Sequence, residues 1–282
     1  MTHDIRPSRV AGHFDRELAV LAERDYVTYA TAFEAAPGIS VIRTPELVAR
    51  RGDLADPYLN LVLGTWAEPS RMDGVIDEAR AALGGPRRPF TWAVWPSNRP
   101  ADLGTRLEAA GIAHDGDAPL MALDLEEADL TLEPTPGLTI ERATDASALA
   151  EASPVTLAMI DGPAAQAVFS AAYEALAFGA ERSLVLFVGR LDGRPVATSA
   201  LYTGTGLAGV YGVGTLPELR GRGFGRAMTI AALAEGRRRG LQVGALMSSE
   251  LGLPVYRRLG FREVGTVGFY TSPPGEPVSP AS

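Results

Sequence analysis

The segment from Ser183 to Leu216 constrains the fold most, because tight turns divide it into three apolar stretches. The first, "SLVLFVGR", is a continuous apolar run, as expected of a strand covered on both faces. Asp192-Gly193 is a strong hairpin signal, and "PVATSALY" follows it as a second strand. After the turn "TGTG", "LAGVYGVGTL" supplies a third strand. The segment therefore predicts an antiparallel meander.

A crossover unit follows this meander. Residues 223–240 ("GFGRAMTIAALAEGRRRG") have an apolar face at helical spacing, and Gly240 is a typical helix stop. "LQVGALM" predicts the next strand, and a strand, helix and strand of this length imply a right-handed crossover with a parallel pair. "GLPVYRRLG" then predicts a short helix, and "FREVGTVGFYTS" predicts a closing strand.

An acidic stretch with two prolines, "DLEEADLTLEPTPGLTIERATD", separates two halves of the chain. We place a domain boundary near Glu133–Pro136, which gives domains of residues 1–134 and 135–282. The length of 282 residues suits either one large α/β domain or two ordinary ones. After the new strand "LTIER", two alanine-rich segments with helical spacing occupy residues 145–159 and 162–179.

The first half shows a fainter version of the same plan. It begins with a predicted helix over residues 13–36 and a predicted strand over 38–44. A strand, a helix, a strand, a helix and a strand are then predicted at 58–66, 69–85, 90–96, 101–112 and 119–125. This order matches the second half from Leu207 onward. Two copies of one fold and two unrelated α/β domains explain the pattern about equally well.

Charge and residue usage exclude several classes of function. The net charge of −8 argues against general nucleic-acid binding and against a basic membrane-surface role. The first residues lack an apolar signal core and the apolar runs are short, so we expect a cytoplasmic protein. The chain has no cysteine and all 26 basic residues are arginine, which excludes cysteine and lysine chemistry. The histidines, His3, His13 and His114, all lie in the first half, and we expect no metal site.

Residues 220–226 ("RGRGFGR") place three arginines and three glycines at the start of the predicted helix. The first amides of a helix have no intrahelical partners, and the helix dipole adds positive potential there. Glycines let a bulky anion approach the backbone, and arginines fork onto phosphate oxygens. From Arg220 to Arg262, nine arginines stand against two acids, Glu235 and Glu250. The turn therefore predicts a phosphate site; a glycine-rich turn with solvated arginines is the alternative.

Arg220–Gly225 fits the pattern (Q/R)-x-x-G-x-(G/A) and resembles the signature turn of the GNAT superfamily, the acyl-CoA-dependent N-acetyltransferases. "VGTLPEL" before it and "VYRRLGF" after it resemble the strand end and the tyrosine-bearing helix of that family, and the resemblance covers roughly residues 137–272. The first half resembles the later part of a GNAT domain without the signature. The chain is thus identified as a tandem GNAT protein with a degenerate first copy. This implies an α/β (α+β) fold of two GNAT-like domains, each a mixed, mostly antiparallel sheet flanked by helices, with splayed strands at the cofactor site.

The resemblance implies acetyl-CoA as the co-substrate and assigns residues to it. Backbone groups of Val213, Gly214 and Thr215 are expected to pair with the pantetheine arm. Ser248 and Ser249 lie where the family often contacts the cofactor, although both are also ordinary turn residues. The pyrophosphate is expected to bind at the turn formed by Arg220, Gly221, Arg222, Gly223, Phe224, Gly225 and Arg226.

Direct attack of an amine on the thioester needs no covalent enzyme intermediate, which suits a chain without cysteine or lysine. A backbone donor near Val213 could stabilise the oxyanion. By the resemblance Tyr256 protonates the leaving thiolate, with core packing as the alternative. The second half has no histidine, so Glu250 is the candidate general base, against the alternative of a solvated carboxylate. The candidate acceptor-pocket residues are aromatic, although the first two fit a helix core equally well: Tyr173, Phe178, Tyr202 and Tyr211.

The expected function is transfer of an acetyl group to a primary amine of a small molecule or peptide, by a monomer or homodimer that binds neither nucleic acid nor membrane. A non-catalytic acyl-CoA sensor is the alternative, because a convincing base is missing. A nucleotide-dependent enzyme is a third hypothesis: Gly204–Gly209 fits GxGxxG, but a strand follows where that fingerprint needs a helix. We expect the first domain to shape the acceptor pocket or a dimer contact.

Overall fold

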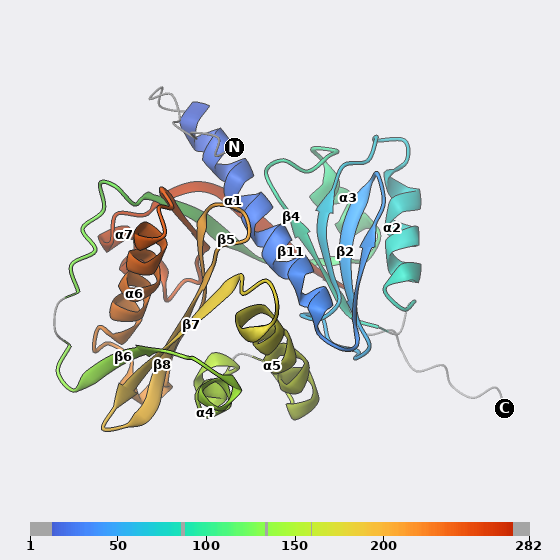
Figure 1. Cartoon of the computed structure of the whole chain (residues 1–282). Helices are drawn as coiled ribbons and strands as arrows, with labels where there is room; N and C mark the ends of the chain where they lie inside the picture. The colour runs from blue at the N-terminus through green and yellow to red at the C-terminus, as the bar shows by residue number, and fades with distance from the viewer. Residues whose placement is uncertain (1–12, 86–87, 133–134, 159, 273–282) are drawn as a thin grey trace.

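The computed structural model describes residues 13–85, 88–132, 135–158 and 160–272. Apolar segments from both halves join in a single eleven-stranded sheet, and helices cover its two faces (Figure 1). The strands lie in the order β1-β2-β3-β4-β11-β5-β10-β9-β8-β7-β6. This is the predicted α/β class with a mixed, mostly antiparallel sheet.

The first half contributes five of these strands. They are β1 (Ile39–Arg43), β2 (Leu47–Gly52), β3 (Leu61–Thr65), β4 (Phe90–Val94) and β5 (Ala113–Asp124). Its helices are α1 (His13–Ala32), the single turn η1 (Phe33–Ala35), α2 (Met72–Ala82) and α3 (Leu103–Ala109). The second strand was not predicted, because "LVARRG" has two adjacent charged side chains that break the apolar pattern. It forms an antiparallel hairpin with β1.

The second half contributes six strands. They are β6 (Leu138–Arg142), β7 (Leu184–Leu191), β8 (Arg194–Tyr202), β9 (Ala208–Thr215), β10 (Val243–Met247) and β11 (Arg262–Ser272). Its helices are α4 (Ala146–Thr156), α5 (Pro163–Phe178), the turn η2 (Pro217–Leu219), α6 (Phe224–Arg238) and α7 (Leu253–Arg258). The predicted domain boundary falls partly on Glu133 and Pro134, which lie outside the described residues, as does His3.

The predicted meander and crossover are both confirmed. β7, β8 and β9 pair antiparallel in sequence order, and the β7–β8 turn has positive φ at Asp192 and Gly193. β9 pairs with β10 in parallel across α6. In the first half β3 pairs with β4 in parallel across α2, so the two halves share the order of strand, helix, strand, helix, strand.

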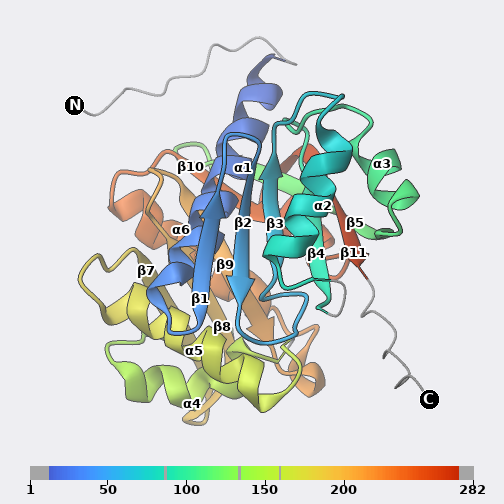
Figure 2. The same cartoon turned by 90° about the vertical axis from the view of Figure 1, so that its right-hand side faces the viewer.

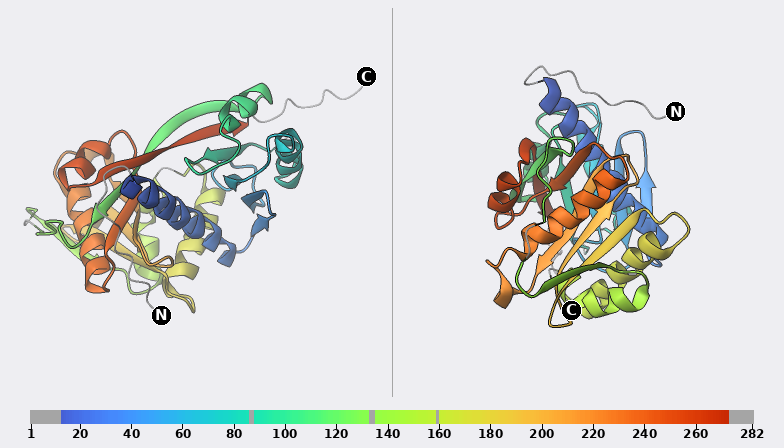
Figure 3. Two further views of the ribbon diagram at one scale, coloured as in Figure 1. Left: turned by 90° about the horizontal axis from the view of Figure 1, so that it is seen from above. Right: turned by 60° about the vertical axis from the view of Figure 1, so that its left-hand side comes forward.

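The two halves exchange their last strands, which the sequence analysis did not anticipate. β5 of the first half pairs with β10 of the second, with Met121 opposite Leu246. β11 of the second half pairs with β4 of the first, with Phe269 opposite Ala93. β5 and β11 also pair with each other, and Figure 3 (left) shows these two long strands running together from one half to the other. The exchange is why both halves share one continuous sheet.

The apolar faces of the helices determine which side of the sheet each covers. α2 packs on one face of β2, β3 and β4, with Val75 and Ile76 against Trp92. α1 lies on the opposite face of these strands, as Figures 1 and 2 show. In the second half α6 covers one face, whereas α4 and α5 cover the other together with Tyr29 and Phe33 from the first half. α1 thus joins the two halves on the face of α4 and α5.

Membrane-spanning helices and clusters of metal-binding side chains are both absent from the described ranges. None of the helices there combines the length and hydrophobicity needed to cross a bilayer. Nor do three or more His, Asp or Glu side chains of those ranges gather in a way that suits a metal ion.

Candidate functional site

The glycine–arginine turn forms an exposed loop at the start of α6. Gly221 and Gly223 have φ of +76° and +84°, a backbone region that residues with a Cβ adopt only under strain. A Cβ placed on either glycine would meet no atom within 4 Å, so the loop surface is open. Side chains therefore do not fill the space in front of this loop.

The amides of this loop are unpaired. The first backbone hydrogen bond of α6 runs from the Ala227 amide to the Gly223 carbonyl at 3.0 Å. Within the part of the chain that the structure describes, no acceptor lies within hydrogen-bond distance of the amides of residues 221–226. The dipole of a fifteen-residue helix adds positive potential at the same end. The arrangement suits an anion with several oxygens.

Three arginines of the loop keep their charge available. Arg220 donates through Nε to the Thr215 carbonyl at 3.4 Å, and the Arg222 guanidinium lies 5.1 Å from the centre of the Phe224 ring. Neither of them, nor Arg226, forms an ion pair with a described acidic residue. The local positive charge predicted from the sequence therefore stays at the loop.

Arginines near the end of α6 share an acidic partner. Arg238 and Arg239 each donate to Glu235 at 2.8 Å. The hydrogen bonds from these guanidinium groups, that of Arg238 first, lower the pKa of Glu235 to about 2. One carboxylate thus offsets part of the positive charge at the end of the helix.

The parallel strands β9 and β10 separate directly beside the loop. They pair only at Ala208–Gly244 and Gly209–Ala245. Beyond this point β9 carries a bulge against β8. The rest of β9, residues 210–215, has no strand partner on the β10 side. The predicted pantetheine-binding residues Val213, Gly214 and Thr215 lie on this open edge, which leads to the loop.

The equivalent gap in the first half is closed by its own chain. β3 and β4 pair only at Leu61–Thr91 and Val62–Trp92, and then separate. The Trp95 indole N–H donates to the Leu63 carbonyl at 2.6 Å, and the Arg99 amide donates to the Thr65 carbonyl at 3.0 Å. The edge that is open in β9 is therefore occupied in β3.

Tyr256 lies on α7 behind the loop. Its ring is 8% exposed and packs edge-on against Phe261 at 5.8 Å between centres. Burial raises the pKa of Tyr256 to about 12, and a hydrogen bond with Thr229 opposes this rise. Thr229 itself donates to the Gly225 carbonyl at 2.8 Å. The Tyr256 hydroxyl is thus protonated at neutral pH and is connected to the loop through α6.

The three polar residues after β10 differ in their surroundings. Ser248 is buried, and its hydroxyl donates to the Ser249 carbonyl at 2.8 Å. The hydroxyl and carbonyl of Ser249 both accept from the Gly252 amide, at 3.3 and 3.1 Å. Both serines thus take part in the turn before α7. Glu250, the candidate base, is exposed on the same turn.

The predicted acceptor residues lie together on the face of α4 and α5. Tyr173 accepts a hydrogen bond from the Tyr29 hydroxyl at 3.1 Å, and Tyr211 stacks on Tyr29 at 3.8 Å with an interplanar angle of 8°. Tyr202 meets Tyr29 edge-on at 5.4 Å. Phe178 packs at the margin of the same apolar cluster. Tyr29 of α1 is therefore the centre of the group, and sequence reasoning missed it because it lies in the first half.

Asp25, four residues before Tyr29, was also missed. Its side chain is fully buried, with Oδ2 accepting from the Tyr211 hydroxyl at 2.6 Å and Oδ1 from the Thr205 hydroxyl. Burial raises the pKa of Asp25 to about 6, against the lowering effect of both hydrogen bonds. The signal available in the sequence was an acid at the helical spacing of the buried Ala22 and Tyr29.

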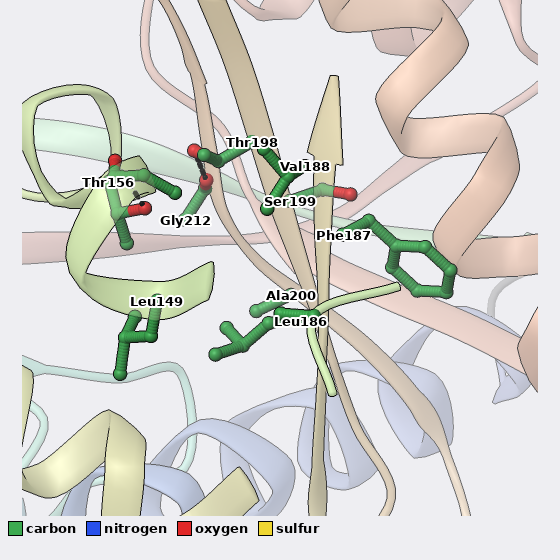
Figure 4. A pocket seen from close by; sticks show the side chains of 11 residues that line it. Leu149, Thr156, Leu186, Phe187, Val188, Thr198, Ser199, Ala200 and Gly212 are labelled. Carbon is green, nitrogen blue, oxygen red and sulfur yellow. Dashed lines mark hydrogen bonds between the residues drawn. The ribbon is translucent and has the colours of Figure 1, made fainter. Parts of the chain in front are cut away.

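A small hollow adjoins this cluster. It lies between α4 and strands β7, β8 and β9 and has room for about one water molecule. Figure 4 shows Leu149 facing Leu186 on the apolar side, and Thr156 near Gly212 at the other end. The Thr198 hydroxyl donates to the Gly212 carbonyl at 3.0 Å. The hollow therefore borders the bulge of β9.

Residues 187–264 match the family described as "Acetyltransferase (GNAT) domain". This part of the chain is similar to a GNAT domain. It includes the open edge of β9, the loop at α6 and Tyr256. No curated protein matches the sequence.

Solved structures show how far the GNAT fold extends. A GCN5-related N-acetyltransferase from Kribbella flavida is 22% identical, covers 91% of this chain and 96% of its own, and has a TM-score of 0.69. A tandem GNAT protein from the clavulanic acid biosynthesis pathway is 17% identical, with coverage of 91% and 96% and a TM-score of 0.58. A GCN5-related N-acetyltransferase from Sphaerobacter thermophilus is 18% identical, with 82% of both chains covered and a TM-score of 0.60. The predicted fold class is confirmed.

Proposed function

We propose that the protein is an N-acyltransferase that transfers an acetyl group from acetyl-CoA to a primary amine of a small molecule or peptide. One observation carries the proposal: an unpaired strand edge, residues 210–215, leads to a loop of unpaired amides that bears three arginines. An extended chain of amides that ends in a diphosphate matches both parts, because the edge offers backbone pairing and the loop offers positive charge. The GNAT domain at residues 187–264 agrees with this assignment.

The residues present fit acetyl-CoA as the acyl donor. Val213, Gly214 and Thr215 would pair with its pantetheine arm, and the amides of residues 221–226 would bind its pyrophosphate. Arg222 and Arg226 are positioned to add charge at the same oxygens. Ser248 and Ser249 would contribute the shape of their turn, and the Ser249 hydroxyl, which accepts from the Gly252 amide, could still donate to the acyl donor.

The proposed reaction is direct attack. The amine nitrogen bonds to the thioester carbonyl carbon, the C–S bond breaks, and the electron pair leaves with sulfur. A backbone donor near Val213 would stabilise the oxygen that becomes negative. Tyr256, whose hydroxyl is protonated at neutral pH, would supply the proton to the thiolate.

We also propose two domains, residues 1–134 and 135–282, of which only the second binds the acyl donor. In the first, Trp95 and Arg99 occupy the gap between the parallel strands. Its contribution is instead made through α1, which carries Tyr29 into the acceptor cluster. This deepens the expectation that the first domain shapes the acceptor pocket.

Thiol release from acetyl-CoA in the presence of a panel of primary amines tests the proposal. We expect amine-dependent release above hydrolysis, and a fall of about 10²-fold or more in turnover for Tyr256→Phe with unchanged acetyl-CoA binding. Tyr270→Phe, which removes the hydroxyl of a tyrosine on β11 that lies against His114 in the first half, is the matched control. Absence of release with every amine, together with no binding of acetyl-CoA by calorimetry, would refute the function.

A further inference from the structure

Asp25 is a buried carboxylate without a cation. Its side chain is 0% exposed, and no arginine among the described residues lies within ion-pair distance of it. Its oxygens are held by two neutral hydroxyls, those of Thr205 and Tyr211. Burying a carboxylate that has only neutral hydrogen-bond donors is costly in free energy, because these donors offset little of the lost hydration. A purely structural role would be filled more cheaply by an amide.

The position of Asp25 is at the point where β9 and β10 separate. A Cβ added to Gly209 would collide with Oδ2 of Asp25, so the carboxylate lies directly against that glycine. Gly209 opposite Ala245 is the last paired position before the open edge begins. A residue of the first half is thus placed at the inner end of the proposed acyl-donor groove.

Tyr211 contacts Asp25 and is next to residues that line the hollow. Its cross-strand neighbour on β8 is Ala200, which lines the hollow, and the next residue along β9 is Gly212, which lines it as well. Side chains of a directly opposed pair lie on the same face of a sheet, so Tyr211 borders the hollow on the α4 side. Its side chain is half-buried and its hydroxyl donates to Asp25.

We propose that the Tyr211 hydroxyl removes the proton from the attacking amine while passing its own proton to Asp25. This inference rests on the proposed acyl transfer. It assigns the role of general base to Tyr211 and Asp25 in place of the exposed Glu250. As the N–C bond forms and the C–S bond breaks, the amine proton moves to the Tyr211 oxygen and the phenolic proton moves to Oδ2 of Asp25. The thiolate takes its proton from Tyr256, and both groups are restored by exchange with water.

The surroundings of Tyr211 and Asp25 favour concerted transfer of the two protons. Burial and the adjacent Asp25 carboxylate raise the pKa of Tyr211 well above its ordinary value, so a lasting phenolate does not form there. Burial raises the pKa of Asp25 to about 6, so the carboxylate is charged at neutral pH and able to accept a proton. The titratable and charged groups around the pair are those of Tyr26, Tyr29, Arg50, Tyr173, Glu181 and Tyr202. None of them ordinarily titrates between pH 5 and 8.

Glu23 offers a matched control on the same helix. It is 4% exposed, and it accepts from the Ser97 hydroxyl at 2.5 Å on the side of the first half. Burial raises the pKa of this carboxyl as well. Glu23→Gln therefore removes a buried charge from α1 without touching the acceptor cluster.

The test compares the pH dependence of turnover for wild type, Asp25→Asn and Glu23→Gln. We expect the turnover of wild type and Glu23→Gln to fall as pH falls through about 6. For Asp25→Asn we expect no such fall near pH 6, and a turnover about 10²-fold below wild type at pH 7.5. Acetyl-CoA affinity should be the same for all three. Tyr211→Phe keeps the carboxylate and the ring stacking, and it should lose turnover to the same extent, which covers failure of Asp25→Asn to fold.

The outcomes separate this inference from the proposed function. Active wild type with an unchanged acid limb in Asp25→Asn, or full turnover in Tyr211→Phe, overturns the relay and leaves the acyltransferase standing. Loss of the same limb in Glu23→Gln also overturns it, because the effect would then belong to any charge on α1. A wild type that transfers no acetyl group to any amine overturns both.

Discussion

Replacing Asp25 by Asn should change how the stability of the protein depends on pH, whatever its activity. The pKa of Asp25 rises from 3.8 to about 6 on folding, chiefly because the carboxylate is buried. The folded state therefore binds this proton more tightly than the unfolded state. Between these two pKa values the folded state holds more protons, so this group makes stability fall as pH rises. Above about pH 6 the penalty is complete, and below about pH 4 it is absent.

The size of the effect follows from the shift. A rise of roughly two pKa units corresponds to ~3 kcal/mol of free energy of unfolding. Asparagine keeps the shape of the side chain and an oxygen for the Thr205 or Tyr211 hydroxyl, but it carries no charge to bury. The difference in stability between Asp25→Asn and wild type should therefore move by ~3 kcal/mol between pH 4 and pH 7.5, in favour of the variant at the higher pH.

Urea unfolding at a series of pH values measures this difference directly. Every other titrating group is common to the two proteins, so subtraction isolates Asp25, and equal m-values would show that the unfolding transition is comparable. Glu235, whose pKa is lowered to about 2, contributes equally to both proteins and therefore cancels in this subtraction. A stability difference that stays constant from pH 4 to 7.5 would refute the reasoning.

Two further predictions concern the acyl donor. Gly223→Ala and Gly193→Ala both place a Cβ at φ near +80° in open space, so each variant should lose ~1–2 kcal/mol of stability. Only Gly223→Ala should also weaken acetyl-CoA binding, by about tenfold as measured by calorimetry. Equal affinities of the two variants for acetyl-CoA would contradict the loop assignment. Calorimetry should also give one acetyl-CoA per chain, because Trp95 and Arg99 close the first-half gap, and a stoichiometry of two would contradict this.

Local patterns were sufficient for most of the secondary structure. The Asp192-Gly193 turn and the glycine stop at Gly240 lie at the ends of elements whose type was predicted, because turn chemistry and periodicity act over a few residues. β2 was missed because its polar side chains break that periodicity. The exchange of β5 and β11 was missed for a different reason: nothing within either strand specifies which neighbour it joins.

For the candidate site, too, the features that depend on local sequence were predictable and those that depend on long-range packing were not. The loop from Arg220 to Arg226 depends on a local spacing of glycines and charges, and the structure leaves it open as expected. Asp25 and Tyr29 come to the site from a helix nearly two hundred residues earlier in the chain, so no spacing in the sequence connects them with Tyr211. The role of Asp25 and Tyr29 depends on how the two halves pack together, and a single sequence contains no local pattern that predicts this packing.

The exchange of β5 and β11 determines whether either half of the protein can exist as a separate fragment. A fragment that ends near residue 134 would lack the strand that belongs beside β4, and a fragment that starts there would leave β10 with a bare row of amides and carbonyls. Such an edge recruits other chains, so separate halves should aggregate unless they are produced together. Neither half could therefore be lost on its own, because the remaining half would have no partner to complete its sheet.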